Sequence, residues 1–71
     1  MRLEELLKVF DFNTTNLVIY TSLEDMGQSE NCTFINNLFS FKKYMNEHSG
    51  AKIVHMTISY DVIDAIEICI M

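Results

Sequence analysis

The stretch KIVHMTISY, residues 52–60, decides the fold together with AIEICIM, residues 65–71. In the first stretch Val, Met, Ile and Tyr alternate with His, Thr and Ser, which is the period of a strand with one buried face. In the second stretch isoleucine occupies every other position, which predicts another strand. Residues 61–64 between them contain neither Gly nor Pro, so a loop of several residues is expected there. The two strands are predicted to lie side by side and antiparallel.

The upstream chain alternates helical and strand patterns. Residues 3–10 place Leu, Leu, Leu and Phe at the i, i+3, i+4 and i+7 positions of an amphipathic helix. Residues 17–21, LVIYT, are β-branched and aromatic and predict a strand. Residues 32–35, CTFI, fit either a short second strand beside the first or the opening of the next helix. That helix is predicted from about residue 36 or 37 onward, with Gly50 as its stop.

This order predicts one α+β domain that spans residues 1–71. Its expected architecture is a single-layer antiparallel or mixed sheet of about three or four strands, with two helices packed on one face. The predicted core consists of Leu6, Leu7, Ile19, Leu38, Phe41, Val54, Ile58, Ile66 and Ile68.

Composition narrows the function classes. Apolar residues make up 49% of the chain, which argues against disorder. Ten acidic residues against five basic ones give a net charge of −5, and Lys42-Lys43 is the only adjacent basic pair. Binding to phosphate backbones needs clustered Lys and Arg, so direct nucleic-acid binding is not expected.

The beginning of the chain and its cysteine count predict a cytoplasmic protein. The first ten residues, MRLEELLKVF, carry two glutamates and do not have the pattern of a signal peptide. No apolar run approaches the ~18–20 residues that cross a bilayer, so no membrane partner is expected. Two cysteines are too few for a disulfide scaffold and suit a reducing cytosol.

No catalytic, cofactor or metal site is predicted. The chain has no CxxC, HxxxH or HExxH spacing, and its two glycines cannot build a phosphate-cradling loop. No cysteine lies on a glycine-bearing elbow where a thiolate would be stabilised. We therefore do not expect an enzyme, although the soft ligands for a metal would be Cys32, Cys69, His48 and His55.

Apolar residues exceed what these single faces can bury. A domain of this size has little interior, so the surplus is either covered by loops or forms an interface. Residues 23–31 also form the most acidic loop, which is either simply solvated or a contact for a basic partner surface. The candidate interface residues are Phe39, Tyr44, Ile53, Cys69 and Met71, with the acidic residues Glu24, Asp25 and Glu30.

Three segments carry a resemblance to a known group of proteins. LEELLKVFD (residues 3–11), LVIY (17–20) and IEICI (66–70) resemble the ends of short accessory proteins from Gram-positive phages and prophages, small acidic anti-CRISPR proteins among them. The resemblance implies a protein–protein interaction domain, acting as a stoichiometric inhibitor of a host nucleic-acid-handling enzyme such as a CRISPR effector. It assigns no role to any residue. The alternative is a self-associating structural or regulatory module, a homodimer without a host enzyme target.

Overall fold

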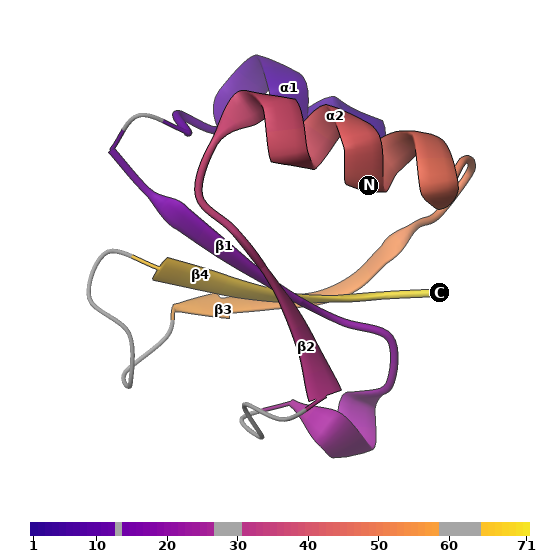
Figure 1. The fold of residues 1–71 in the computed structure, drawn as a ribbon. Coiled ribbons are helices and arrows are strands. Elements are labelled where there is room, and N and C mark those ends of the chain that lie inside the picture. Colours follow the sequence, from indigo (N-terminus) through magenta and orange to yellow (C-terminus); the bar gives the residue numbers. More distant parts are fainter. Residues whose placement is uncertain (13, 27–30, 59–64) are drawn as a thin grey trace.

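The computed structural model describes residues 1–12, 14–26, 31–58 and 65–71. Both α-helices lie on one side of an open four-stranded sheet (Figure 1), so the α+β fold predicted from the sequence is confirmed. The segment that fitted either strand or helix is a strand, β2. Along the chain the elements are the 3-10 helix η1 (Leu3–Glu5), α1 (Leu6–Val9), β1 (Asn16–Tyr20), the 3-10 helix η2 (Leu23–Asp25), β2 (Cys32–Ile35), α2 (Leu38–Glu47), β3 (Ile53–Ile58) and β4 (Ala65–Ile70).

The sheet is mixed, with the strand order β2-β1-β4-β3. β1 pairs with β2 antiparallel and with β4 parallel. β3 and β4 are adjacent and antiparallel, as the sequence predicts. The connection through α2 carries the chain from β2 at one edge of the sheet to β3 at the other. The two strands that flank α2 in the sequence are therefore the two edge strands.

The main core lies between the helices and the sheet. Phe41 at its centre is fully buried, and its ring lies 4.7 Å from that of Phe12. The ring of Phe12 also lies 4.7 Å from that of Phe10, tilted by 53°, so Phe12 belongs to the core. The buried members of this core are Leu3, Leu6, Phe12, Leu17, Ile19, Ile35, Phe41, Tyr44, Ile68 and Ile70.

A second, smaller core lies on the opposite face of the sheet. Val18, Tyr20 and Ala65 are buried there, and Met26 and Cys32 pack against them. η2 lies on this side, away from the two α-helices (Figure 1). The sheet therefore has apolar residues on both of its faces, and η2 covers part of the face that the α-helices leave open.

Local signals in the sequence fix both ends of α2. The side-chain Oδ1 of Asn37 accepts a hydrogen bond of 2.8 Å from the backbone N–H of Ser40, so Asn37 is the N-cap. After the helix, Gly50 has φ +83°, in the left-handed region that glycine adopts without strain. This turn directs the chain from α2 into β3.

The predicted core is correct in part. Leu6, Ile19, Phe41 and Ile68 are buried, and Ile66 is half-buried. Four other members are exposed, and their prediction was wrong. α1 has only one turn and buries Leu6 alone, and α2 turns its Phe41 and Tyr44 inward. The exposed four are Leu7, Leu38, Val54 and Ile58.

Candidate interaction site

β3 forms an exposed edge of the sheet. Its first residue, Ile53, is half-buried, and every residue from Val54 to Ile58 is exposed. The apolar side chains are well exposed, with fractions of 46% for Val54, 44% for Met56 and 68% for Ile58. An edge strand offers unpaired backbone N–H and C=O groups to a neighbouring chain. β3 combines that backbone edge with exposed apolar side chains.

The strand register separates β3 into an apolar row and a polar row. Met56 lies opposite Ile68 and Ile58 opposite Ile66, so both project from the face of the sheet that carries the helices. Val54 shares this face because side chains alternate along a strand. His55 and Thr57 project from the other face. The sequence therefore predicts the faces of residues 54–58 correctly, although it is wrong about the burial of Val54 and Ile58.

The pairing of β3 with β4 is irregular at its start. The register shifts between Ile53 and His55, which places a β-bulge at the rim of the sheet. Ile53 packs against the helix-side core, whereas Val54 beside it remains half open to solvent. Bulges bend and twist an edge strand, and they are common next to functional sites. The exposed part of β3 begins at this bulge.

The beginning of the chain covers the first part of the β3 edge. The backbone carbonyl of Met1 accepts a hydrogen bond of 2.7 Å from the N–H of Ile53, and the N–H of Leu3 donates to the carbonyl of Ala51 at 3.0 Å. Both bonds lie at or before Ile53. Beyond that residue, the described part of the chain provides no further strand beside the outer edge of β3.

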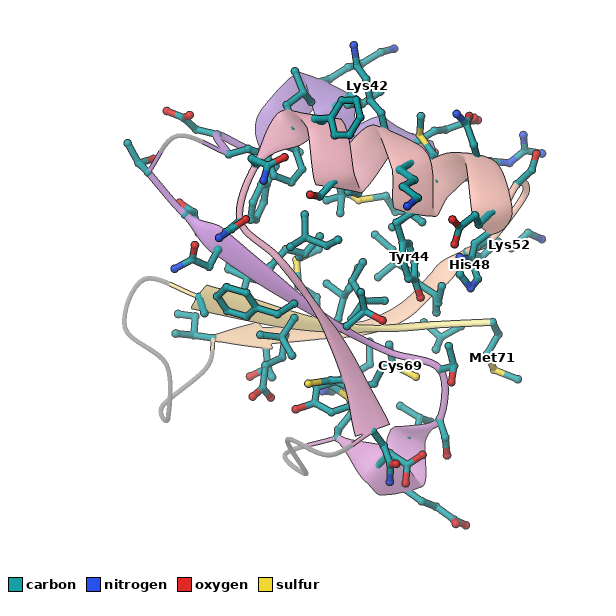
Figure 2. All side chains as sticks on the ribbon, viewed as in Figure 1. Lys42, Tyr44, His48, Lys52, Cys69 and Met71 are labelled. Carbon is teal, nitrogen blue, oxygen red and sulfur yellow. The ribbon has the colours of Figure 1, made fainter. Side chains whose placement is uncertain are left out.

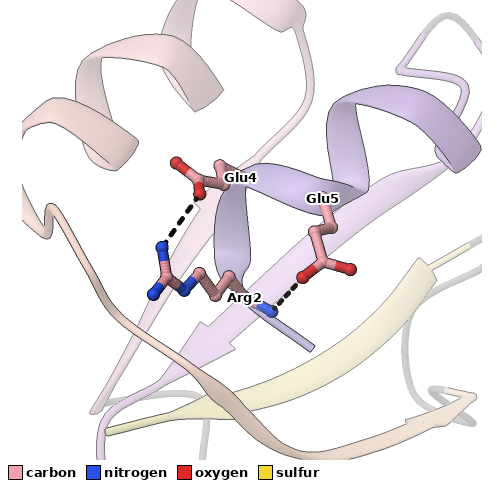
Figure 3. Close-up of polar contacts among 3 residues, drawn as sticks. All are labelled: Arg2, Glu4 and Glu5. Carbon is pink, nitrogen blue, oxygen red and sulfur yellow. Dashed lines mark hydrogen bonds and ion pairs between the residues drawn. The ribbon is translucent and has the colours of Figure 1, made fainter.

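Arg2 holds this N-terminal segment in place at the start of η1. Its backbone N–H donates to the carboxylate Oε1 of Glu5 at 3.2 Å (Figure 3). Its guanidinium lies 3.6 Å from the carboxylate of Glu4, but both side chains are about 60% exposed, so this ion pair contributes little. The backbone bonds to β3 and the Glu5 contact therefore position the segment.

The apolar interface residues predicted from the sequence do not form one surface. Phe39 and Met71 are each 80% exposed and remain available to a partner. Ile53 belongs to the helix-side core, and not to the opposite face where it was expected. Tyr44 and Cys69 are buried, so neither side chain is open to a partner on the surface of this structure.

Tyr44 is buried because α2 directs it toward the sheet. It stacks on His48, one turn later, with ring centroids 4.0 Å apart (Figure 2). Its phenol forms a hydrogen bond with the side chain of Thr33 in β2. Burial raises the pKa of this phenol, and the charge of Glu47 acts in the same direction, while the Thr33 bond opposes them. Tyr44 thus links α2 to the β2 edge.

Cys69 is buried because it lies in the central strand β4, on the face that η2 partly covers. Burial raises the pKa of its thiol, and the nearby carboxylate of Asp25 raises it further. A raised pKa keeps the thiol protonated and unreactive at neutral pH. Cys32 is half-buried on the same face, and the two cysteines do not form a disulfide with each other.

The acidic loop is described only in part. Glu24 is exposed, whereas Asp25 is half-buried and accepts a hydrogen bond of 3.2 Å from the side-chain amide of Asn31. Glu30 lies outside the described residues. Of the three acidic residues predicted as a contact for a basic partner, Glu24 is the one that the structure places on the open surface.

The hollows of the described surface are shallow. One of them, of about 330 Å³, lies beside the Gly50 turn and the end of β4. Among the described residues that line it, His48 has the only ionisable side chain, and its Nδ1 lies 3.0 Å from the Tyr44 carbonyl. Among the described residues, no group of three or more His, Cys, Asp or Glu side chains could hold a metal ion. Nor does that part of the chain contain a helix long and apolar enough to cross a membrane.

Comparison with protein-family models, with curated proteins and with solved structures finds no match for this chain. The functional argument therefore uses the residues of the chain itself. The surface that sequence reasoning missed is the apolar row Val54, Met56 and Ile58, which alternation placed on the buried face of the strand. Alternation shows which side chains share a face, but it does not show what covers that face.

Proposed function

We propose that this chain is a non-enzymatic protein–protein interaction domain that binds through the outer edge of β3. The observation that carries the proposal is the run of exposed residues from Val54 to Ile58 in an edge strand. Addition of a strand to such an edge is a common mode of protein recognition. Backbone hydrogen bonds supply affinity in this mode, and alternate side chains supply specificity.

The charge distribution supports a protein partner. The strand Ile53–Ile58 contains no Asp, Glu, Lys or Arg, although the chain as a whole has a net charge of −5. An uncharged apolar edge does not attract phosphate groups. It suits a strand that brings apolar side chains of its own. The more specific expectation from the resemblance, that the target is a nucleic-acid-handling host enzyme, is compatible with this mode and stays a prediction.

Affinity capture with matched variants tests the proposal. The immobilised chain is exposed to a lysate of a Gram-positive bacterium, to which untagged copies of the chain are added. Three baits are compared: the wild type, Met56→Lys, which places a charge in the apolar row, and Phe39→Lys, the same charge on another exposed apolar residue. We expect wild type and Phe39→Lys to retain the same proteins and Met56→Lys to lose them. Equal retention by wild type and Met56→Lys contradicts the proposal.

A further inference from the structure

We infer that the partner of this edge is the β3 strand of a second copy of the chain, paired antiparallel about a twofold axis at Met56. The inference rests on the proposed function, because it names the partner of the same edge. A twofold arrangement uses one surface twice, and such dimers are the most common closed assemblies. In the resulting dimer the two four-stranded sheets would join into one continuous sheet.

The N-terminal segment limits this pairing at one end. Its last contact with the β3 edge is at Ile53, and the described part of β3 beyond that contact is residues 54–58. When this segment pairs antiparallel with its own copy, every position finds a partner only if the middle residue, Met56, lies opposite itself. A shift toward the start of β3 would place the second copy against Met1–Leu3.

This register matches the side chains of the two copies. Val54 of one copy lies opposite Ile58 of the other, and the two Met56 side chains meet at the axis. All of them project from the helix-bearing face, so the two apolar rows become one. On the opposite face His55 lies opposite Thr57, and both are polar. The pairing therefore covers exposed apolar surface without burying an unpaired charge.

The net charge of −5 on each copy does not oppose this contact. The acidic residue nearest to β3 in the described sheet is Glu67, which lies in β4 opposite Thr57. In the dimer the two Glu67 side chains would be three strand spacings apart, or about 14 Å. That separation exceeds the Debye length of about 8 Å at physiological salt. Salt therefore screens their repulsion.

Sedimentation tests the association. We expect the wild type and Phe39→Lys to shift from monomer to dimer as the concentration rises through the micromolar range. Met56→Lys would remain monomeric over the same range, because two lysines would face each other at the axis. Circular dichroism shows whether each variant is folded. A wild type that stays monomeric up to millimolar concentration overturns the inference.

Disulfide formation tests the register and does not depend on the folding of Met56→Lys. Met56→Cys should form an intermolecular disulfide under mild oxidation, since the two residues would lie directly opposite each other. Ile58→Cys is the matched control, because its two copies would be offset by four residues, about 13 Å along the strand. A disulfide needs Cα atoms within about 7 Å. Equal cross-linking of the two variants overturns the twofold register.

The two proposals fail in different ways. A monomeric wild type whose capture of lysate proteins still depends on Met56 overturns self-pairing and supports the interaction edge. If neither sedimentation nor capture depends on Met56, both proposals are overturned.

Discussion

The two edge strands of the sheet, β2 and β3, differ in how far the rest of the chain buries their side chains. Ile35 in β2 is 3% exposed, whereas Ile58 in β3 is 68% exposed, although both are isoleucines in edge strands. β2 has four residues and lies in contact with α2. β3 has six residues, and its exposed part begins where the N-terminal segment ends. β2 therefore keeps two exposed residues, Thr33 and Phe34, whereas all five residues from Val54 to Ile58 in β3 are exposed.

The lengths of the helices explain this difference. α2 follows β2 directly and folds back over it, so Phe41 and Tyr44 cover that side of the sheet. η1 begins beside β3, but the α1 helix that follows has four residues and is therefore about 6 Å long. The six residues of β3 extend over about 20 Å. A helix of one turn cannot cover that length, which leaves Met56 and Ile58 in solvent.

The largest expected effect concerns the closed side of the sheet. Replacing Phe41 with Ala should cost about 3–5 kcal/mol, because the ring is fully buried against Phe12. That cost is comparable to the whole stability of so small a domain. Leu38→Ala, in the same helix but 44% exposed, should cost less than about 1 kcal/mol. Thermal unfolding followed by circular dichroism compares the two variants, and equal losses would contradict the assignment of the core.

A smaller effect should separate the two edge strands themselves. Ile35→Ala should lower the free energy of unfolding by about 2–4 kcal/mol, because it creates a cavity in a buried site. Ile58→Ala should lower it by less than about 1 kcal/mol, because that side chain is already in solvent. Urea unfolding measures both in the Met56→Lys background, which we expect to be monomeric. A larger loss for Ile58→Ala would mean that β3 is covered within the monomer.

The smallest effect concerns the bond between α2 and β2. Tyr44→Phe removes the hydrogen bond with Thr33 and should cost about 1 kcal/mol. The pKa of Tyr44 is raised in the folded chain, so the folded state keeps its proton to higher pH than the unfolded chain, in which the pKa is about 10. Its contribution is therefore fully present below pH ~10 and is lost as the pH rises through the folded pKa.

Unfolding of wild type and Tyr44→Phe at neutral pH and above pH ~10 checks this dependence. We expect the difference between the two proteins to shrink as the pH rises, because the wild type loses a contribution that phenylalanine never had. A difference that does not change with pH would mean that Tyr44 is open to solvent.

Much of the fold follows from patterns that are local in the sequence. Alternation and turn residues predict β1, β3 and β4, and they leave β2 open between a strand and the start of a helix. The antiparallel pairing of β3 with β4 follows from their adjacency in the sequence. Asn37 and Gly50 mark the ends of α2 through backbone chemistry that depends on few neighbours. Periodicity also identifies which side chains share a face.

Burial at the edges depends on what lies above each strand, and the sequence pattern does not contain that information. Val54 and Ile58 alternate as buried residues do, yet β3 is the last strand of the sheet and no long helix covers it. Cys69 shows the opposite error, because it was expected on an open face and is fully buried, on the face where a second small core of Val18, Tyr20 and Ala65 forms. The candidate interaction site was missed for this reason.

Amide hydrogen exchange, followed residue by residue by NMR at several protein concentrations, tests the central claim most directly. In the monomer, amides on the outer edge of β3 between Val54 and Ile58 should exchange rapidly, because nothing in the described chain covers that edge. We expect their protection to rise with protein concentration, while the amides of β2 keep the same protection throughout. Protection of β3 that is already high at the lowest concentration, or that never changes with concentration, would contradict the account.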